Sequence, residues 1–253
     1  MNKLSVVIIT FNEEKNIERC LLSVKDIADE IVVVDSLSTD STKRICQKFG
    51  VRFIEQTFLG YIEQKNFAAS LANFDLVLSL DADEALDETL INSIAEVKEN
   101  WDKDGYFMNR VTNYCGKWIR HGAWYPDKKL RLWNKTKGSW AGVNIHEWYQ
   151  MIPGSKTGHL KGDILHFSYE SIEAHVAQFN KFTSLSAIEM NKSEIKASVS
   201  KIYLNPLVNF FKGFFLRLGF LDGYYGTMIC FFNAFATYTK YLKLRQLNKG
   251  LRM

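Results

Sequence analysis

The sequence contains few cysteines, and none of them belongs to a paired motif. Among 253 residues there are four, Cys20, Cys46, Cys115 and Cys230, and they lie far apart without a CxxC pair. This spacing argues against a zinc site and against a disulfide framework, and it fits a reducing cytoplasm.

Two glycine-rich motifs and a leader segment are also missing. Neither GxGxxG nor GxxxxGK followed by Ser or Thr occurs, which argues against a dinucleotide Rossmann site and a Walker phosphate loop. Residues 1–4 run directly into an apolar strand pattern without the long apolar region and cleavage site of a signal peptide. We therefore expect a cytoplasmic protein.

Acidic residues are scarce at the C-terminal end. The net charge is +4, but from Lys201 onward eight lysines and arginines face only Asp222, which gives +7 there and leaves −3 for residues 1–200. This asymmetry argues against nucleic-acid binding by the acidic part and indicates an anionic surface as the partner of the tail.

Apolar runs of strand length alternate with helical patterns over the first hundred residues. We expect strands at residues 4–10, 31–34, 52–55 and 76–80, since these runs lack solvent-facing alternation and suit a sheet covered on both faces. Asn12 can cap a helix whose apolar positions fall near residues 17–24. This order predicts an α/β fold with a mainly parallel central sheet and flanking helices.

The pattern changes near residue 100. Asp87 can cap a helix before the change, and short strands are expected at residues 106–111, 117–119 and 130–133. Aromatics among glycines and basic residues often form sugar or phosphate pockets, although they also close sheet edges. We divide the chain into a catalytic domain at 1–170, with halves at 1–100 and 101–170, and a helical region at 171–253.

Three acidic residues follow the apolar run at 76–80. Asp81 and Asp83 alternate with Ala82, so a continuing strand would point both carboxylates to one side, where they could share a divalent cation. The alternative is that they form only a turn and a helix cap. In a parallel sheet this strand end is where ligands bind.

The ordered set of motifs resembles family 2 glycosyltransferases of the GT-A fold. The segments are VVIITFNEE at 6–14, IVVVDS at 31–36 with STD at 38–40, QKN at 64–66 and LDADE at 80–84. Further segments resemble bacterial lipopolysaccharide core glycosyltransferases that use UDP-glucose, namely WYPD at 124–127, RLW at 131–133, VNIHE at 143–147 and GFLDG at 219–223.

The resemblance implies an inverting, metal-dependent single displacement. A hexose, expected to be glucose, would move from a UDP-sugar to a lipopolysaccharide core or related glycolipid or saccharide acceptor. The likeness of LDADE to the DXD motif implies that Asp83 binds Mg²⁺ or Mn²⁺ directly and that Asp81 supports the ribose or the metal shell. His166 is a candidate for completing the metal coordination, with a structural histidine as the alternative.

Residues at the ends of the first two strands are assigned to the nucleobase and ribose by the same resemblance. They are Thr10, Asn12, Glu13, Glu14 and Asp35. Asp35 would accept the uracil imide hydrogen bond, whereas helix capping is the alternative for Asn12 and Glu13.

Two basic residues are candidates for phosphate binding. Lys65 would contact the nucleotide or a phosphate, with an exposed helix lysine as the alternative. Arg131 would face a phosphate of donor or acceptor, with a structural ion pair as the alternative.

The catalytic base is expected to be Glu147. Many family 2 enzymes activate the acceptor with an acidic residue well downstream of the DXD motif, and His146-Glu147 occupies the comparable region. Because a Glu-Asp pair is usual there, Asp127 is retained as the rival.

The C-terminal region is expected to meet the membrane without crossing it. Its longest charge-free part, 223–239, is 17 residues long, at the lower limit for a span. We expect interfacial helices on the inner face of the cell membrane, with a homo-oligomer interface or a packed hairpin as the alternative. A sugar nucleotidyltransferase and a non-enzymatic saccharide-binding or scaffold protein are the rival function classes.

Overall fold

The structure is a computed structural model that describes residues 2–143 and 146–251. The chain forms two compact units. The sheet unit comprises Met1–Arg110 and Asp127–Phe167, and the helical unit comprises Val111–Pro126 and Ser168–Met253. The short segment 111–126 thus belongs with the C-terminal helices, although it lies in the middle of the sequence.

Four parallel strands form one half of the central sheet. In spatial order they are β3 (Arg52–Glu55), β2 (Glu30–Asp35), β1 (Leu4–Thr10) and β4 (Leu76–Asp81). The expected strands are all confirmed here. Their carboxyl ends lie at one edge, with Thr10 paired to Asp35 and Ile9 paired to Asp81.

Antiparallel strands complete the sheet beyond β4. The order continues with β8 (Asp127–Asn134), β6 (Gly105–Tyr114), β11 (Thr157–Tyr169) and β5 (Glu84–Leu86), and β7 (Lys117–Ile119) pairs with β6. A separate two-stranded sheet joins β9 (Gly138–Val143) to β10 (His146–Met151), and the 3₁₀ turn η1 (Lys135–Lys137) precedes it. The α/β fold class is confirmed.

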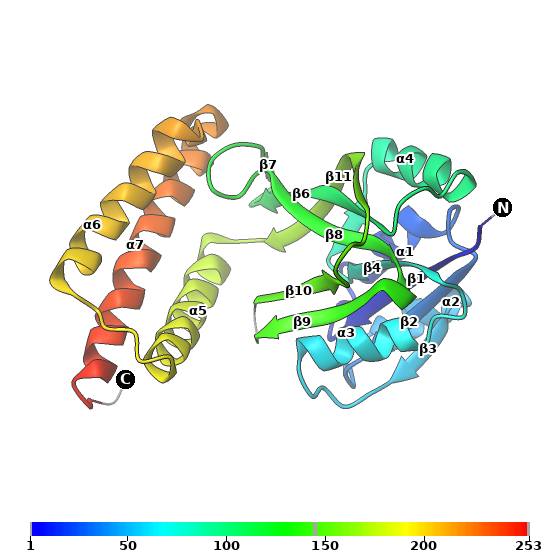
Figure 1. Cartoon of the computed structure of the whole chain (residues 1–253), viewed down its shortest axis with the longest axis horizontal. Coiled ribbons are helices and arrows are strands. Elements are labelled where there is room, and N and C mark those ends of the chain that lie inside the picture. The colour runs from blue at the N-terminus through cyan, green and yellow to red at the C-terminus, as the bar shows by residue number, and fades with distance from the viewer. Residues whose placement is uncertain (1, 144–145, 252–253) are drawn as a thin grey trace. The chain divides into compact units, whose positions relative to one another are not determined.

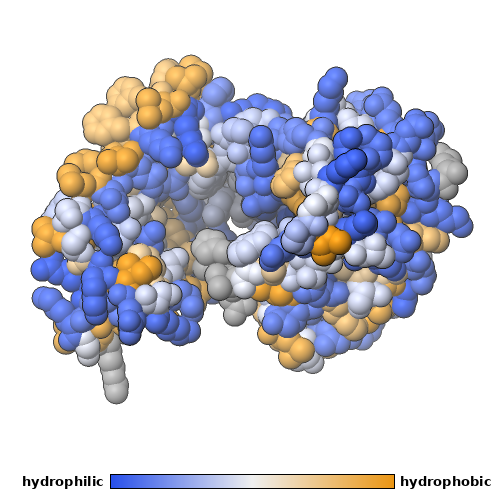
Figure 2. Space-filling model, viewed as in Figure 1, coloured by the Kyte–Doolittle hydropathy of each residue, from blue (hydrophilic) through white to orange (hydrophobic). Residues whose placement is uncertain are grey.

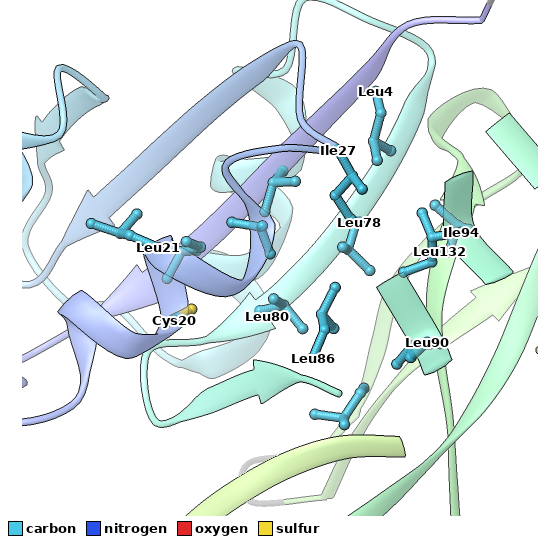
Figure 3. Packing of buried hydrophobic residues seen from close by; sticks show 14 of the residues in the cluster. Leu4, Cys20, Leu21, Ile27, Leu78, Leu80, Leu86, Leu90, Ile94 and Leu132 are labelled. Atoms are coloured by element: carbon cyan, nitrogen blue, oxygen red, sulfur yellow. The ribbon is translucent and has the colours of Figure 1, made fainter. Parts of the chain in front are cut away.

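Helices cover both faces of the parallel half. Side chains alternate along β1, so that Leu4, Val6 and Ile8 join one core cluster and Val7 joins another. The first cluster includes residues of α1 (Ile17–Val24), α2 (Thr42–Lys48) and α4 (Glu88–Glu99), and Figure 3 shows part of this packing. The second includes residues of α3 (Tyr61–Ser70) and of the β9–β10 pair.

One expected helix cap is wrong and one is confirmed. Helix α1 begins after Asn16, whereas Asn12 has φ 55° and its Oδ1 accepts a hydrogen bond from the Thr39 backbone N–H at 2.9 Å. Asn12 therefore joins two loops and does not cap a helix. Asp87 caps α4 as expected, since its Oδ1 accepts from the Leu90 N–H at 2.7 Å.

After residue 171 the described part of the helical unit consists of three helices and two short turns. They are α5 (Ile172–Lys192), α6 (Val199–Phe211), the π turn η2 (Lys212–Leu216), the 3₁₀ turn η3 (Gly219–Asp222) and α7 (Gly223–Asn248). Helix α7 packs against both α5 and α6 (Figure 1). Across the described residues, every helix is either too short or too polar to cross a membrane.

Candidate functional site

Two loops are tied together at the carboxyl edge of the parallel strands. The backbone N–H groups of Asn12, Glu13 and Glu14 donate to Ser38 Oγ at 2.7 Å, Thr42 Oγ1 at 2.9 Å and Asp40 Oδ2 at 3.0 Å. Loop 11–14 after β1 and loop 36–42 after β2 therefore hold each other in place.

Asp35 lies beneath these loops at the end of β2. It is only 1% exposed, and its two carboxylate oxygens accept from the backbone N–H and the hydroxyl of Ser38. In this structure Asp35 therefore orders the loop that follows it. Its neighbour Thr10 is also buried, and its hydroxyl oxygen has no hydrogen-bond partner among the described residues.

A buried lysine joins two candidate carboxylates. Lys65 on α3 is 2% exposed, and its Nζ lies 3.0 Å from Asp81 Oδ1 and 2.9 Å from Glu147 Oε1. The exposed-lysine alternative is thus wrong. The structure brings Asp81 at the end of β4 and Glu147 on β10 together through one ammonium group.

Arg131 holds Asp81 from the other side. Its Nη2 donates to Asp81 Oδ2 at 2.9 Å and to Glu84 Oε1 at 3.0 Å, so the structure shows Arg131 in ion pairs. Within residues 2–143 and 146–251, its Nε and Nη1 are buried without a hydrogen-bond partner. Trp140 packs beside both cations, with its ring centroid 4.6 Å from Lys65 Nζ and 5.5 Å from Arg131 Cζ.

Glu84 and Arg110 are site residues to which sequence reasoning assigned no role. The fully buried Glu84 carboxylate accepts from Arg131 and, at 3.1 Å, from Arg110, while Arg110 Nη2 lies 2.8 Å from Asp127 Oδ2. Asp127 also pairs with Lys129 at 3.1 Å. The sequence feature that could have indicated a role for Glu84 is its position at the start of the buried run Glu84–Leu86.

Burial and nearby charges shift two carboxyl pKa values in opposite directions. Burial opposes ionisation of Asp81, but Lys65 and Arg131 outweigh it and hold the pKa of Asp81 well below its usual range. Burial raises the pKa of Glu13, and the carboxylates of Asp83 and Asp81 add to this rise although a hydrogen bond from Asn16 opposes it. Glu13 thus lies within the negative field of the acidic motif.

Asp83 does not share the partners of Asp81. The strand ends at Asp81, residues 82 and 83 form a turn, and Asp83 Oδ2 lies 3.1 Å from His166 Nε2. His166 reaches it from β11, which pairs with β5 at Glu84. The chain therefore turns at residues 82 and 83, and the expectation that both carboxylates lie along one strand face is wrong. Neither aspartate caps a helix, because Asp87 is the cap of α4.

The Asp83–His166 pair fits a divalent cation that takes further ligands from a substrate. Among the described residues no group of three or more His, Cys, Asp and Glu side chains could hold a metal ion. Mg²⁺ and Mn²⁺, however, are often held by one or two protein ligands plus phosphate oxygens and water. Asp83 Oδ2 and His166 Nε2, which lie 3.1 Å apart in a direct contact, are the two protein atoms that could hold such an ion.

The charge of the site also leaves room for a cation. Its carboxylates are Glu13, Asp81, Asp83, Glu84, Asp127 and Glu147, and its cations are Lys65, Arg110, Lys129 and Arg131. Six negative and four positive charges leave −2, which one divalent ion would balance. His166 Nδ1 is buried and has no hydrogen-bond partner in the part of the chain that the structure describes.

The expected motif at 143–147 is only partly described. Asn144 and Ile145 lie outside the described residues, and for His146 the structure describes the strand position alone. Within that motif the Glu147 side chain alone contributes to the geometry above.

Comparison with known proteins identifies relatives along nearly the whole chain. The profile of "Glycosyl transferase family 2" matches residues 5–166. An uncharacterized glycosyltransferase of Rickettsia typhi is 33% identical over 258 residues, covering 98% of this chain and 88% of that protein. The lipopolysaccharide core biosynthesis glycosyltransferase LpsC of Rhizobium meliloti is 28% identical, covering 96% of this chain and 94% of that protein.

Solved structures resemble the chain at lower similarity. S. aureus TarS residues 1–349, crystallised with UDP, matches with a TM-score of 0.48 and 16% identity over 98% of this chain and 92% of that one. Glucosyl-3-phosphoglycerate synthase of Mycobacterium tuberculosis, crystallised with Mn²⁺ and UDP-glucose, matches with a TM-score of 0.38 and 21% identity over 44% of each chain.

Proposed function

The chain belongs to glycosyl transferase family 2, and we propose that it transfers a hexose, glucose first among the candidates, from a UDP-sugar to a saccharide acceptor with inversion. The observation that carries the proposal is the strand-end site, where Lys65 holds Asp81 and Glu147 and the Asp83–His166 pair lies at the adjoining turn. Family membership makes the protein a glycosyltransferase, so the nucleotidyltransferase and scaffold alternatives are set aside.

The UDP moiety would bind along the carboxyl edge of β1 and β2. Thr10, with its unpartnered hydroxyl, and the tied loop bearing Asn12, Glu13 and Glu14 support this placement. Asp35 supports it by ordering the second loop, and its carboxylate oxygens keep lone pairs for a uracil imide.

Asp83 and His166 would hold Mg²⁺ or Mn²⁺, and Mn²⁺ suits the imidazole nitrogen better because Mg²⁺ favours oxygen ligands. When bound, such an ion neutralises the leaving diphosphate. Asp81, already paired with Lys65 and Arg131, would serve the ribose or the outer shell of the ion. The unpartnered Nε and Nη1 of Arg131 are further donors for an anionic group.

Glu147 would accept the proton of the attacking acceptor hydroxyl. The acceptor oxygen forms a bond to the anomeric carbon while the bond from that carbon to the diphosphate oxygen breaks, and the electron pair leaves with UDP. Lys65 orients the Glu147 carboxylate at 2.9 Å. Asp127 is the second candidate, because two cations, Arg110 and Lys129, bind its carboxylate, whereas Glu147 pairs with Lys65 alone among the described residues.

The acceptor would be a lipopolysaccharide core or another glycolipid. The 28% identity to LpsC over nearly the full length supports this class of acceptor. Such a substrate is anchored in the membrane, so the enzyme would work as a peripheral protein on the cytoplasmic face, at an anionic lipid surface to which the helical unit binds.

Thermal stabilisation by UDP tests the donor and metal assignments. We expect UDP with Mn²⁺ to raise the melting temperature of the wild type, and EDTA or Asp83→Asn to abolish most of that rise. Asp26→Asn, at an exposed aspartate outside the site, is the matched control and should respond like the wild type. An equal response of Asp83→Asn and wild type would refute the metal assignment, and preference for GDP- or dTDP-sugars would refute the donor.

A further inference from the structure

The outward face of α6 is apolar, and no other described part of the chain covers it. Val199, Tyr203, Leu207, Phe211 and Phe215 follow one another at four-residue spacing from α6 into η2, and each is between 52% and 56% exposed. Because residues four apart lie on one side of a helix, these side chains form a continuous stripe. The opposite side of α6 is buried at Ile202 and Pro206.

The stripe ends in an apolar tip between α6 and α7. Leu216 is 80% exposed, and Leu218, Phe220 and Leu221 are 44%, 41% and 54% exposed. Phenylalanine rings connect the tip to both helices, with Phe214 and Phe220 centroids 5.6 Å apart and Phe210 and Phe231 centroids 4.7 Å apart. Figure 2 shows hydrophobic side chains gathered over this end of the helical unit.

The charges beside this surface are all positive. Residues 199–221 contain Lys201, Lys212 and Arg217 and no aspartate or glutamate. Among the described residues neither Lys212 nor Arg217 forms a salt bridge. The next carboxylate, Asp222, is buried and accepts from the backbone N–H groups of Arg120 and His121.

We propose that the α6 stripe and the 212–221 tip form an interfacial anchor for an anionic lipid bilayer. The apolar side chains of this surface can contact the acyl chains of lipids, while the neighbouring Lys212 and Arg217 attract the negative head groups. Helix α6 has only 13 residues, so it lies along the interface. The charge-free segment of α7 buries Ile229 and Cys230 against the rest of the helical unit, and only its other side, with Phe231 and Phe235, is exposed.

Only the biological role of this anchor, access to a lipid-linked acceptor, rests on the proposed function. Lipid binding itself requires no sugar transfer. It can therefore be measured even if the donor or acceptor assignment fails.

Co-sedimentation of the full chain with vesicles tests the anchor. We expect binding to vesicles of phosphatidylcholine with phosphatidylglycerol, and weaker binding to pure phosphatidylcholine. Leu216→Glu with Leu221→Glu should lower the partition coefficient about tenfold or more, because both side chains are exposed and their loss removes apolar contact with lipid. Lys212→Gln with Arg217→Gln should remove the preference for anionic lipid and its salt dependence.

A matched control and a mass measurement separate the outcomes. Leu22→Glu, at a 47% exposed leucine on α1, should bind vesicles like the wild type. UDP binding should be unchanged in all these variants, which reports an intact sheet unit. The proposal would be overturned if the wild-type protein did not co-sediment with anionic vesicles. A stable oligomer that the Leu216/Leu221 variant dissociates without any change in lipid binding would also overturn it, since the surface would then join copies of the chain.

Discussion

Lys65 determines the balance of charge at the centre of the site. Its side chain is 2% exposed, and its ammonium group lies within 3.0 Å of both Asp81 and Glu147. Asp81 is 16 residues and Glu147 is 82 residues away from Lys65 in the sequence. Two carboxylates that face one another without a cation repel each other, and water is largely excluded from this location.

Lys65→Met should therefore destabilise the protein. We expect a loss of about 3 kcal/mol in the free energy of unfolding, the lower end of the cost of breaking a buried ion pair, measured by urea denaturation at pH 7. Lys43→Met is the matched control, since the Lys43–Glu55 pair is about half exposed and should contribute only about 0–1 kcal/mol. Equal losses in both variants would contradict a central role of Lys65.

Glu147 and Asp127 can be separated by their neutral amides. Glu147→Gln should keep UDP binding and lower the transfer rate by about 10² or more, as expected for loss of a general base. Asp127→Asn should have the smaller effect, because Arg110 and Lys129 engage that carboxylate. Single-turnover rates and UDP titrations measure both quantities, and the reverse order of effects would transfer the base role to Asp127.

At the scale of elements, the start of α5 is held by a buried histidine. His175 is 4% exposed, its Nδ1 lies 2.9 Å from the Tyr114 hydroxyl, and the rings of Trp124, Tyr169 and Phe232 surround it. Burial lowers the pKa of His175 from 6.5 to about 4. The imidazole is thus neutral in the folded protein at pH values where it would be charged in the unfolded chain.

This difference predicts a loss of stability in acid. Between pH 6.5 and 4 the unfolded chain binds a proton at His175 that the folded state does not, so stability falls as pH falls. The shift corresponds to about 3 kcal/mol, lost progressively from pH 6.5 down to pH 4. Urea titrations at pH 7 and pH 4 give the free energy of unfolding of the wild type and of His175→Phe. From pH 7 to pH 4 the wild type should lose about 3 kcal/mol more of this free energy than the variant.

The control for this prediction is His159→Phe, at an exposed histidine of β11. Its stability difference from the wild type should not vary over the same pH interval. If the free energy of unfolding of the wild type and of His175→Phe fell equally between pH 7 and pH 4, His175 would not be the cause of the loss.

Elements differ in how far local sequence defines them. The buried strands and the Asp87 cap follow from apolar runs and from a side chain that bonds to the backbone three residues on. Asn12 fails as a cap because tertiary hydrogen bonds between loops 11–14 and 36–42 fix its backbone at positive φ. Asp83 leaves the strand direction of Asp81 because the chain must turn there into β5, which pairs with β11.

At the scale of the whole molecule, all four thiols are free and sheltered. Cys20, Cys46 and Cys230 are buried, Cys115 is partly buried, and burial raises the pKa of each thiol, that of Cys46 to about 12. Because the thiolate is the reactive form, these groups should react slowly in the folded protein.

Ellman's reagent at pH 8 tests this expectation. The folded protein should show slow reaction of about one thiol, Cys115, and the protein in guanidinium should show four. Because the three buried thiols become accessible only on opening of the structure, their reaction rate should increase with urea together with unfolding. Rapid modification of two or more thiols in the folded protein would contradict the packing of both units.

The α/β class and the residue types at the strand ends could be predicted from the order of amino acids alone. Those features depend on neighbours in the chain, because apolar runs bury strands and polar residues end them. The acidic motif, the basic tail and the family resemblance are also present in the sequence itself. The partners of the acidic residues are not.

The pairing of Asp83 with His166 across 83 residues, and of Lys65 with Glu147 across 82, is visible only in the folded chain. The folded chain also exposes an apolar stripe on α6, while the charge-free part of α7 buries Ile229 and Cys230 and exposes Phe231 and Phe235. The physical reason is common to these cases. Which side chains meet depends on strand order, antiparallel return and helix packing, and those are set by burial of the whole core and not by any local pattern.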